Sequence, residues 1–190
     1  MIDFAIRRLR SGDSLDGLTS LLHNAFGELA LRGIDCQCAS QSVERTRERV
    51  ERGECFIAVS GGEVIGTVTL EHVDRGSSIA AYRDPATASL HQLAVDPTRQ
   101  GEGVGRSLIA YAGAWARARR YERLALDTPE GAQRQRAWYF DRGFDILETV
   151  HVQGRRYASV VLARWLTPAA SGSRPRAVTP SRLACRHGRS

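Results

Sequence analysis

The sequence predicts an α/β protein built on a mixed, twisted sheet of about seven strands, with helices on both faces. Short apolar runs alternate along the chain with longer segments in which apolar residues recur at helical spacing. A strand-like run (90–95), a helix-like segment (104–120) and a second strand-like run (123–126) follow one another. This order indicates two parallel strands joined by a right-handed crossover. On either side of the unit, apolar runs separated by short glycine-containing turns indicate antiparallel hairpins.

The N-terminal part of the chain is predicted to hold one strand and two helices. Residues 4–9 form a short apolar run that is typical of a strand. Residues 15–26 carry leucine and phenylalanine at helical spacing and follow residues that suit a helix cap. Residues 27–39 are expected to form a loop. A second helix then starts at a serine cap, Ser40 or Ser42, and ends at a glycine.

The middle of the chain is predicted to contain three strands. Residues 55–59 and 64–70 are rich in apolar and β-branched side chains, and a Gly-Gly turn joins them into a hairpin. Residues 71–88 form a polar connection, to which the sequence assigns no regular structure. Residues 90–95 are a further apolar run, which an Asp-Pro pair ends.

The C-terminal elements complete a β-α-α-β-β-β-α-β-α-β-β order. The helix over residues 104–120 has one apolar stripe opposite an arginine-rich face. This stripe consists of Val104, Leu108, Ala112 and Trp115. Strand 123–126 and helix 132–142 follow, and a final hairpin pairs residues 144–152 with residues 157–166.

Length and charge indicate one domain, residues 1–167, and a separate tail, residues 168–190. The net charge is +6, but the tail contributes five Arg and no acid, so the domain itself is close to neutral. The tail is rich in Pro, Ser, Gly and Arg and has no periodic apolar face, so we expect it to be disordered. A solvated extension is the leading interpretation, and contact with nucleic acid or anionic surfaces is the alternative.

Cysteine usage and hydropathy favour a cytoplasmic protein without a membrane segment. Cys36, Cys38, Cys55 and Cys185 are scattered, and no His pair accompanies the Cys-x-Cys spacing, so reduced thiols are expected rather than a metal site. No apolar run approaches the ~20 residues of a membrane span. The N-terminal residues lack the apolar core of a signal peptide.

A glycine-rich loop, residues 100–105 (QGEGVG), leads directly into the helix over residues 104–120. Glycines at alternate positions let the backbone approach a ligand without Cβ clashes. The free N–H groups at the start of a helix, together with its dipole, favour an anion. We therefore expect a phosphorylated cofactor at this loop.

The residues around the loop exclude several phosphate-binding classes. The chain contains no Lys, so all 27 basic residues are Arg, which excludes a Walker loop and a pyridoxal phosphate aldimine. The dinucleotide fingerprint G-x-G-x-x-G would need a glycine where Arg106 stands. Asp127 could take the place of the ribose-binding acid of a dinucleotide-binding fold. However, the chain has only one β-α-β unit, which begins near residue 90.

The remaining pattern, [Q/R]-x-x-G-x-[G/A], resembles the pyrophosphate loop of the GNAT superfamily of acyl-CoA-dependent N-acetyltransferases. The preceding residues 93–97 (LAVDP) are similar to the family's fourth strand and its exit. Residues 139–144 (YFDRGF) are similar to the Tyr-x-x-x-Gly-Phe/Tyr ending of its fourth helix. The two motifs lie about forty residues apart in the expected order, and the resemblance covers roughly residues 3–166.

The resemblance implies transfer of an acetyl group from acetyl-CoA to a primary amine by direct attack on the thioester. In the family, the backbone N–H at the position of Val95 lies near the thioester and stabilises the oxyanion. Tyr139 matches the tyrosine that serves as general acid toward the departing thiolate. The residues expected to bind the cofactor are Val95, Gln100, Gly101, Glu102, Gly103, Val104, Gly105, Arg106 and Tyr139.

His91 is the leading candidate for the general base, with Glu71 or a water relay as alternatives. Arylalkylamine acetyltransferases in the family carry a histidine at this strand position. His91 stands four residues before Val95, so the two side chains should point to the same face of the sheet. A packed histidine without a catalytic role is the other interpretation.

One position departs from the family pattern. Many members have an Asn seven residues before the tyrosine, where this chain has Ala132, and Gln133 is offset by one position. A side-chain hydrogen bond from this helix to the pantetheine arm is therefore in doubt. Asp127 and Thr128, at the end of the preceding strand, are candidates to replace it.

The acceptor is expected to be a small-molecule amine that enters over the first two helices and residues 71–88. Acids on that wall (Glu28, Asp35, Glu71 and Asp74) could attract a cationic amine. A protein N-terminus or lysine is an alternative acceptor, and a catalytically idle acyl-CoA-binding sensor or interaction module is an alternative function. No metal, membrane or specific nucleic acid is expected as a partner, and a homodimer is left open.

Overall fold

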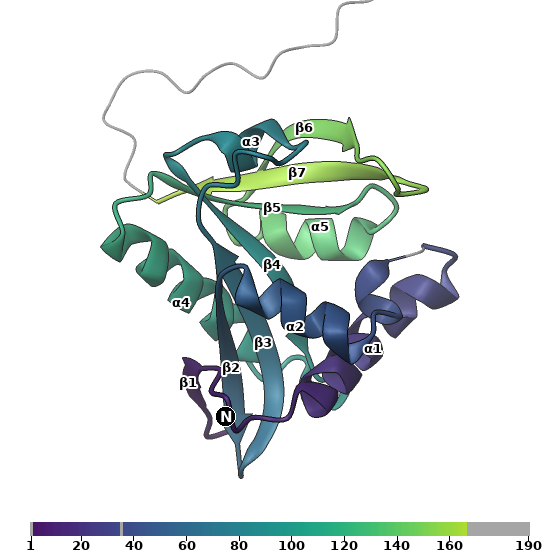
Figure 1. The fold of residues 1–190 in the computed structure, drawn as a ribbon, viewed down its shortest axis with the longest axis vertical. Coiled ribbons are helices and arrows are strands. Elements are labelled where there is room, and N and C mark those ends of the chain that lie inside the picture. The colour runs from purple at the N-terminus through teal and green to yellow at the C-terminus, as the bar shows by residue number, and fades with distance from the viewer. Residues whose placement is uncertain (1, 35, 167–190) are drawn as a thin grey trace, which may run out of the picture.

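The computed structural model describes residues 2–34 and 36–166 and contains a seven-stranded sheet in the order β1-β2-β3-β4-β5-β7-β6 (Figure 1). The strands are β1 (Ala5–Arg8), β2 (Glu54–Ser60), β3 (Glu63–Glu71), β4 (Thr87–Val95), β5 (Arg123–Pro129), β6 (Asp145–His151) and β7 (Ala158–Trp165). The helices are α1 (Leu15–Leu31), α2 (Val43–Glu51), α3 (Ala80–Arg83), α4 (Val104–Ala118) and α5 (Gln133–Phe140). Two short 3₁₀ turns, η1 (Gln37–Ala39) and η2 (Pro97–Arg99), precede α2 and the glycine loop.

The sheet is mixed, as the sequence predicts. β4 and β5 run parallel and are joined by α4, whereas the other neighbouring strands of the described chain pair antiparallel. β4 and β5 pair only at Thr87–Ser89 and Arg123–Ala125, near the start of each strand. Beyond these positions the two strands diverge, and Figure 1 shows them running apart. This divergence opens the sheet at the carboxyl end of β4, where the glycine loop begins.

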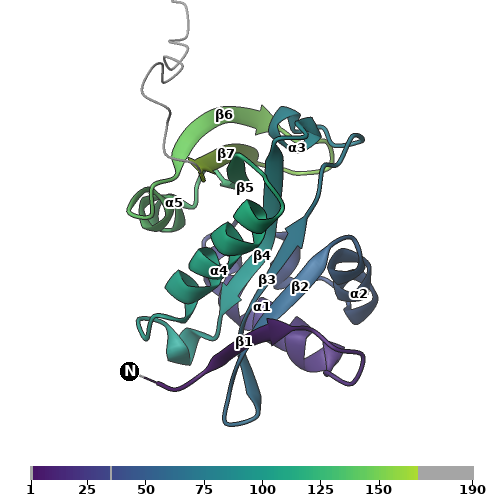
Figure 2. The ribbon, with the colours of Figure 1, turned by 90° about the vertical axis from the view of Figure 1, so that its left-hand side faces the viewer.

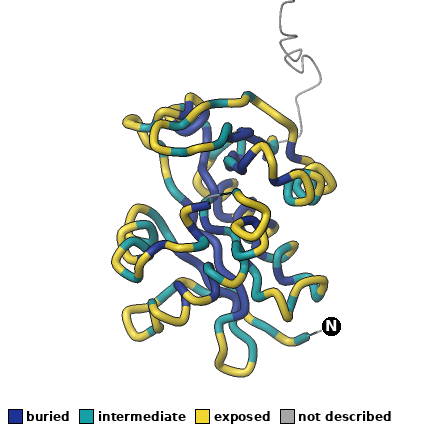
Figure 3. Tube along the Cα trace, turned by 90° about the vertical axis from the view of Figure 1, so that its right-hand side faces the viewer, coloured by how far each residue is buried: buried dark blue, intermediate teal, exposed yellow. Residues whose placement is uncertain are grey.

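Helices cover both faces of the sheet, which confirms the predicted layers. Figure 2 shows α4 and α5 on one side and α2 on the other. The larger core lies on the α4 side, where the predicted stripe of this helix is buried against the strands: Val104, Leu108, Ala112 and Trp115. Leucines of α1 pack on the opposite face, against Cys55 and Ile57 of β2. Figure 3 shows that the buried residues concentrate along the strands and the inner faces of the helices.

Two predicted segments differ from the structure. The loop expected over residues 27–39 is wrong in its first part, because α1 continues to Leu31 and buries Leu29 against a small cluster with Cys36 and Cys38. The connection over residues 71–88 contains α3, whose Tyr82 packs on β5 and β7. The segment 71–88 looks polar in sequence because only a few of its side chains face the core.

A bulge in β4 overturns the expectation that His91 and Val95 share one face of the sheet. Gln92 adopts a left-handed φ of 50°, and the pairing with β3 shifts register at this point. An extra residue in a strand reverses the alternation of side chains beyond it. Leu90 and Val95 therefore both pack on the α4 side, and His91 lies on the opposite face, beside Tyr82.

Some expectations fall on residues that the structure does not describe, among them Asp35, Cys185 and the tail 168–190. Cys36, Cys38 and Cys55 are buried free thiols. Within residues 2–34 and 36–166, no helix combines the length and the apolar character that crossing a membrane requires. The same residues contain no cluster of three or more His, Cys, Asp or Glu side chains arranged to hold a metal ion.

Candidate active site

A cavity of about 550 Å³ opens between α1, the end of β4, the glycine loop and α5. Its walls include most of the residues predicted to bind the cofactor: Val95, Gln100, Gly101, Gly103, Val104, Gly105, Arg106 and Tyr139. Glu102 is not among the lining residues, and its carboxylate lies 3.8 Å from the guanidinium of Arg99. The loop therefore faces the cavity mainly with its backbone and its glycines.

The backbone of the glycine loop presents unused donors to this cavity. The main-chain N–H groups of residues 103–106, at the start of α4, have no hydrogen-bond partner among the described residues. Gly101 and Gly103 have left-handed φ angles of 86° and 93°, and a Cβ at either position would meet nothing within 4 Å. Open space on the Cβ side, together with N–H groups at the start of α4, suits close approach of a phosphate.

The cavity wall also carries positive charge. Arg99, Arg106, Arg134 and Arg142 all line it. Burial, reinforced by the charge of Arg106, lowers the pKa of Arg142, whose guanidinium lies 3.6 Å from the ring centroid of Trp138. Several guanidinium groups around free N–H donors form a setting in which a polyanion such as a pyrophosphate is stabilised.

A second, smaller cavity of about 130 Å³ meets the first one at the divergence of β4 and β5. Residues from α1, η1, α2, β4, β5 and the segment before β7 line it. Four residues line both cavities: Phe26, Leu93, Gln135 and Tyr139. The site thus consists of two adjacent cavities that share a wall, of which Tyr139 is part.

Tyr139 lies at this junction with its ring fixed by aromatic neighbours. The ring centroids of Trp138 and Phe144 are 5.2 Å and 5.5 Å away, both in edge-on arrangements. Burial raises the pKa of the phenol above its usual value of 10, with Asp127 adding to the shift. The phenol is therefore protonated at neutral pH and has a proton to donate.

His91 lines the second cavity and is held by polar neighbours on its own face of the sheet. Its Nε2 lies 2.9 Å from Oγ of Ser89 and 3.7 Å from Oε2 of Glu71. The ring of Tyr82 packs edge-on at 5.2 Å. Burial lowers the pKa of His91, and the carboxylates of Glu71 and Asp127 offset only part of this shift. The imidazole is therefore neutral near pH 7 and can accept a proton.

The N–H of Val95 points into the gap between β4 and β5. Val95 pairs with Gly66 of β3, and the bond from the Asp96 N–H to the Ile65 carbonyl (3.0 Å) shows that this is a non-hydrogen-bonded pair. In such a pair both residues turn their N–H and C=O groups away from the partner strand. The N–H is thus directed toward the divergence, at the edge of the first cavity.

Asp127 and Thr128 line the second cavity rather than the first. The Asp127 carboxylate is paired with Arg155 and accepts a hydrogen bond of 2.9 Å from the Tyr82 hydroxyl. Although burial opposes ionisation, Arg155 holds the pKa of Asp127 below its usual value. Ala132, at the position of the family's Asn, is buried in a small apolar cluster.

The acids expected on the acceptor wall do not line the second cavity. Glu28 borders the first cavity and pairs with Arg32 and Arg134. Glu71 does not line the second cavity itself but lies 3.7 Å from His91, which does. Asp74 accepts a hydrogen bond from the Gly76 N–H within its own turn. Asp35 lies outside the described residues.

The structure adds residues that no sequence motif indicated. Gln135 borders both cavities, and its Oε1 is buried without a hydrogen-bond partner among the described residues. Arg49, Gln92 and Arg155 come from three distant segments and meet in the second cavity. Gln135 lies on the same helix as Gln133, two positions further along. The amide side chains near the position of the family's Asn were therefore the sequence signal that could have indicated it.

The second cavity also exposes a pair of thiols on η1. Cys36 and Cys38 both line it. A hydrogen bond from Cys36, aided by the charge of Arg49, lowers the pKa of Cys38 to about 7, and the same contact raises the pKa of Cys36. Nη1 of Arg49 lies 3.4 Å from Sγ of Cys38.

Comparison with known proteins identifies relatives of this fold. The model of the acetyltransferase (GNAT) family matches residues 22–144, about two thirds of the chain. No curated protein matches the sequence significantly. The family match includes the glycine loop and the Tyr139 region.

Many solved structures are similar, at low identity. The ribosomal-protein-S18-alanine N-acetyltransferase of Escherichia coli has a TM-score of 0.65 at 18% identity, covering 90% of this chain and 99% of that one. An IAA acetyltransferase of Bacillus cereus has a TM-score of 0.60 at 23% identity, covering 86% and 99%. A GNAT family acetyltransferase of Elizabethkingia anophelis, with acetyl-CoA bound, has a TM-score of 0.61 at 19% identity, covering 85% and 97%. At these identities the likeness establishes the fold.

Proposed function

Because this chain belongs to the acetyltransferase (GNAT) family of acyl-CoA-dependent N-acyltransferases, we propose that it transfers the acetyl group of acetyl-CoA to the primary amine of a small molecule. The observation that carries the proposal is the meeting of two cavities at Tyr139. The larger compartment suits the phosphorylated carrier, and the smaller one suits the acceptor. Both substrates can then be bound at once, which direct attack on a thioester requires.

The first cavity fits acetyl-CoA by its donor set. The N–H groups of residues 100–106 would hold the pyrophosphate, with Arg106 and Arg142 adding charge-assisted bonds. The orphaned Oε1 of Gln135 is an acceptor for an amide N–H of the pantetheine arm. When bound, acetyl-CoA supplies the activated acetyl group as a thioester.

Three groups of the chain would carry the transfer. His91 receives a proton from the amine, so that the nitrogen lone pair can form the new C–N bond. The Val95 N–H stabilises the negative charge that develops on the carbonyl oxygen. Tyr139 donates its phenolic proton to the sulfur as the C–S bond breaks. Glu71 is the rival base, since it lies 3.7 Å from His91.

A peptide N-terminus is the second candidate acceptor. The Escherichia coli enzyme with a similar structure is named for acetylation of an alanine of a ribosomal protein. A cavity of about 130 Å³ admits a small molecule or the end of a chain, and not a folded surface. A cytoplasmic location and a homodimer remain predictions of the sequence.

Release of free thiol from acetyl-CoA, measured across a panel of amines and short peptides, tests the proposal. Calorimetric titration with acetyl-CoA is run on the same protein. Binding together with acceptor-dependent thiol release is the expected result. Binding without thiol release on any acceptor would contradict catalysis and favour an acyl-CoA sensor on the same fold.

A further inference from the structure

We propose that the second cavity takes an amine that also carries a carboxylate, such as a free amino acid, and that Arg49 and Gln92 bind that carboxylate. This inference rests on the proposed function, because it names the chemical class of the acceptor. Four observations carry it: the free donors of Arg49, the network that fixes this side chain, the orphaned amide of Gln92 and the charge balance of the cavity wall.

Arg49 projects from α2 into the second cavity with most of its donors unused. Its Nη1 donates to Oε1 of Gln41 (2.9 Å) and contacts Sγ of Cys38 (3.4 Å). Its guanidinium forms no ion pair with a carboxylate of the described chain, although a guanidinium offers five N–H donors. The remaining donors can bind both oxygens of a ligand carboxylate in the geometry that arginine favours.

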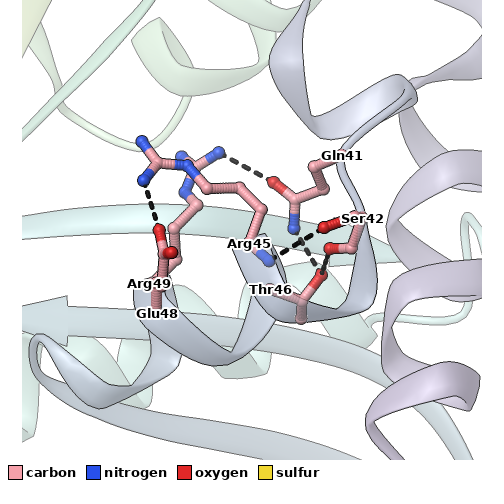
Figure 4. A network of polar contacts seen from close by, with 6 residues as sticks. All are labelled: Gln41, Ser42, Arg45, Thr46, Glu48 and Arg49. Atoms are coloured by element: carbon pink, nitrogen blue, oxygen red, sulfur yellow. Dashed lines mark hydrogen bonds and ion pairs between the residues drawn. The ribbon is translucent and has the colours of Figure 1, made fainter.

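A buried polar network holds Arg49 in place (Figure 4). Gln41 is 6% exposed, and its amide donates from Nε2 to Oγ1 of Thr46 (2.7 Å) while its Oε1 accepts from Arg49. Thr46 in turn donates to the Ser42 carbonyl (3.1 Å) at the start of α2. A side chain fixed before binding loses less conformational entropy when the ligand arrives. The network therefore preorganises a cation toward the cavity.

Gln92 of β4 supplies a second donor to the same cavity. The residue is 6% exposed and lines the second cavity. Its Oε1 accepts from the Thr69 hydroxyl (3.4 Å), which fixes the orientation of the amide, and its Nε2 has no hydrogen-bond partner among the described residues. A buried N–H group without an acceptor is costly, so it indicates an oxygen supplied by a ligand.

The charges of the wall favour an acceptor that brings its own negative group. Arg155 is neutralised by its ion pair with Asp127, whereas Arg49 contacts Gln41 and the Cys38 thiol and pairs with no carboxylate of the described residues. His91 is neutral at pH 7 because burial lowers its pKa. A cationic amine that carries no carboxylate would therefore place a second positive charge near the Arg49 guanidinium. The carboxylate of an amino acid would instead neutralise that guanidinium.

The positions of Arg49, Gln92 and His91 also fit the carboxylate and the amine of such an acceptor. Gln92 follows His91 directly on β4, so a carboxylate bound at Gln92 and Arg49 brings an adjacent amine to the vicinity of the candidate base. The side chain would meet the apolar residues Phe26, Leu29 and Leu126 of the same cavity. A peptide N-terminus has an amide at the place of this carboxylate, so the inference favours a free amino acid over a peptide.

Matched acceptors test the inference directly. For each of several apolar L-amino acids, thiol release from acetyl-CoA is compared with that of its carboxamide and of its decarboxylated amine. We expect kcat/KM to be about ten- to a hundredfold higher for the amino acid, the range for a charge-assisted hydrogen-bond pair. Equal or better use of the carboxamide or the amine would overturn the inference and leave the proposed function intact. No thiol release with any member would overturn both.

Two variants assign the effect to the residues. Arg49→Gln should raise the acceptor KM for amino acids about ten- to a hundredfold and remove the preference over the carboxamides. Arg45→Gln is the matched control, because Arg45 lies on the same helix but pairs with Glu48 at the surface. Gln92→Glu keeps the shape and replaces the donor by a repelling carboxylate, so it should also raise this KM. Melting temperature and acetyl-CoA affinity verify folding, and an unchanged preference in folded Arg49→Gln would contradict the assignment.

Discussion

Tyr139 lies where the two cavities adjoin and has a proton to donate, whereas His91 lines the second cavity and is able to accept one. Burial raises the pKa of the phenol and lowers that of the imidazole. At neutral pH these shifts keep the phenol protonated and the imidazole neutral, which are the resting states that a general acid and a general base need. Each of them can be tested by a variant that keeps its shape.

Tyr139→Phe is expected to lower kcat by roughly ten- to ten-thousand-fold, the span expected for a lost general acid. The phenylalanine keeps the edge-on contacts with Trp138 and Phe144, so acetyl-CoA affinity should change little. Steady-state kinetics and calorimetry measure the two quantities separately. A kcat within twofold of the wild-type value would show that Tyr139 only packs.

His91 should produce a rise of kcat/KM with pH, because only the neutral imidazole accepts a proton. Burial lowers its pKa in the folded protein, so the midpoint should lie below the usual ~6.5. His91→Gln should remove this rise and lower turnover, since the amide keeps a hydrogen bond but cannot take up a proton. If the rise persists in His91→Gln, the base is another group, and Glu71→Gln becomes the decisive variant.

Among the elements, the glycine loop and α4 form the one unit whose structure and expected role both follow from local sequence. The loop needs glycines in the left-handed conformation, and the helix needs an apolar stripe. Both features can be recognised in one contiguous stretch of the sequence. The bulge in β4 was not predictable in the same way. Glutamine has no intrinsic preference for the left-handed φ of Gln92, so tertiary contacts must impose it.

Gly103→Val is expected to weaken acetyl-CoA binding strongly, because its side chain would fill the open space beside the N–H donors. The left-handed φ of 93° makes the substitution strained as well, so a control for strain is needed. Gly62→Val provides it, since Gly62 has a φ of 87° and open surroundings in the β2–β3 turn. Calorimetry should show lost affinity in Gly103→Val alone. Equal affinities in the two folded variants would place the phosphate site elsewhere.

The candidate site was predictable where its residues are close in sequence and not where they converge from afar. The loop residues and Tyr139 belong to contiguous motifs, and they line one cavity. Arg49, Gln92 and Arg155 come from α2, β4 and the segment before β7, and nothing local marks them as neighbours. Their convergence depends on the divergence of β4 and β5, which is a property of the whole sheet.

For the whole molecule, the residues that line either cavity fall between Ala25 and Tyr157. Leu166 is buried, and its N–H donates to the Glu122 carbonyl (2.8 Å) at the end of the described core. Removal of residues 168–190 is therefore expected to leave both the melting temperature and the turnover number unchanged. Thermal denaturation and the thiol assay measure the effect. A melting temperature lower by several degrees would show that the tail contributes to the folded body.

The central claim is that the carrier and the acceptor occupy the two adjacent cavities at the same time. Initial velocities measured against acetyl-CoA at several fixed acceptor concentrations test it most directly. Simultaneous occupancy with direct attack predicts double-reciprocal lines that intersect, because both substrates must be bound before thiol is released. Parallel lines would show that the acetyl group first moves to the protein, and would contradict the account.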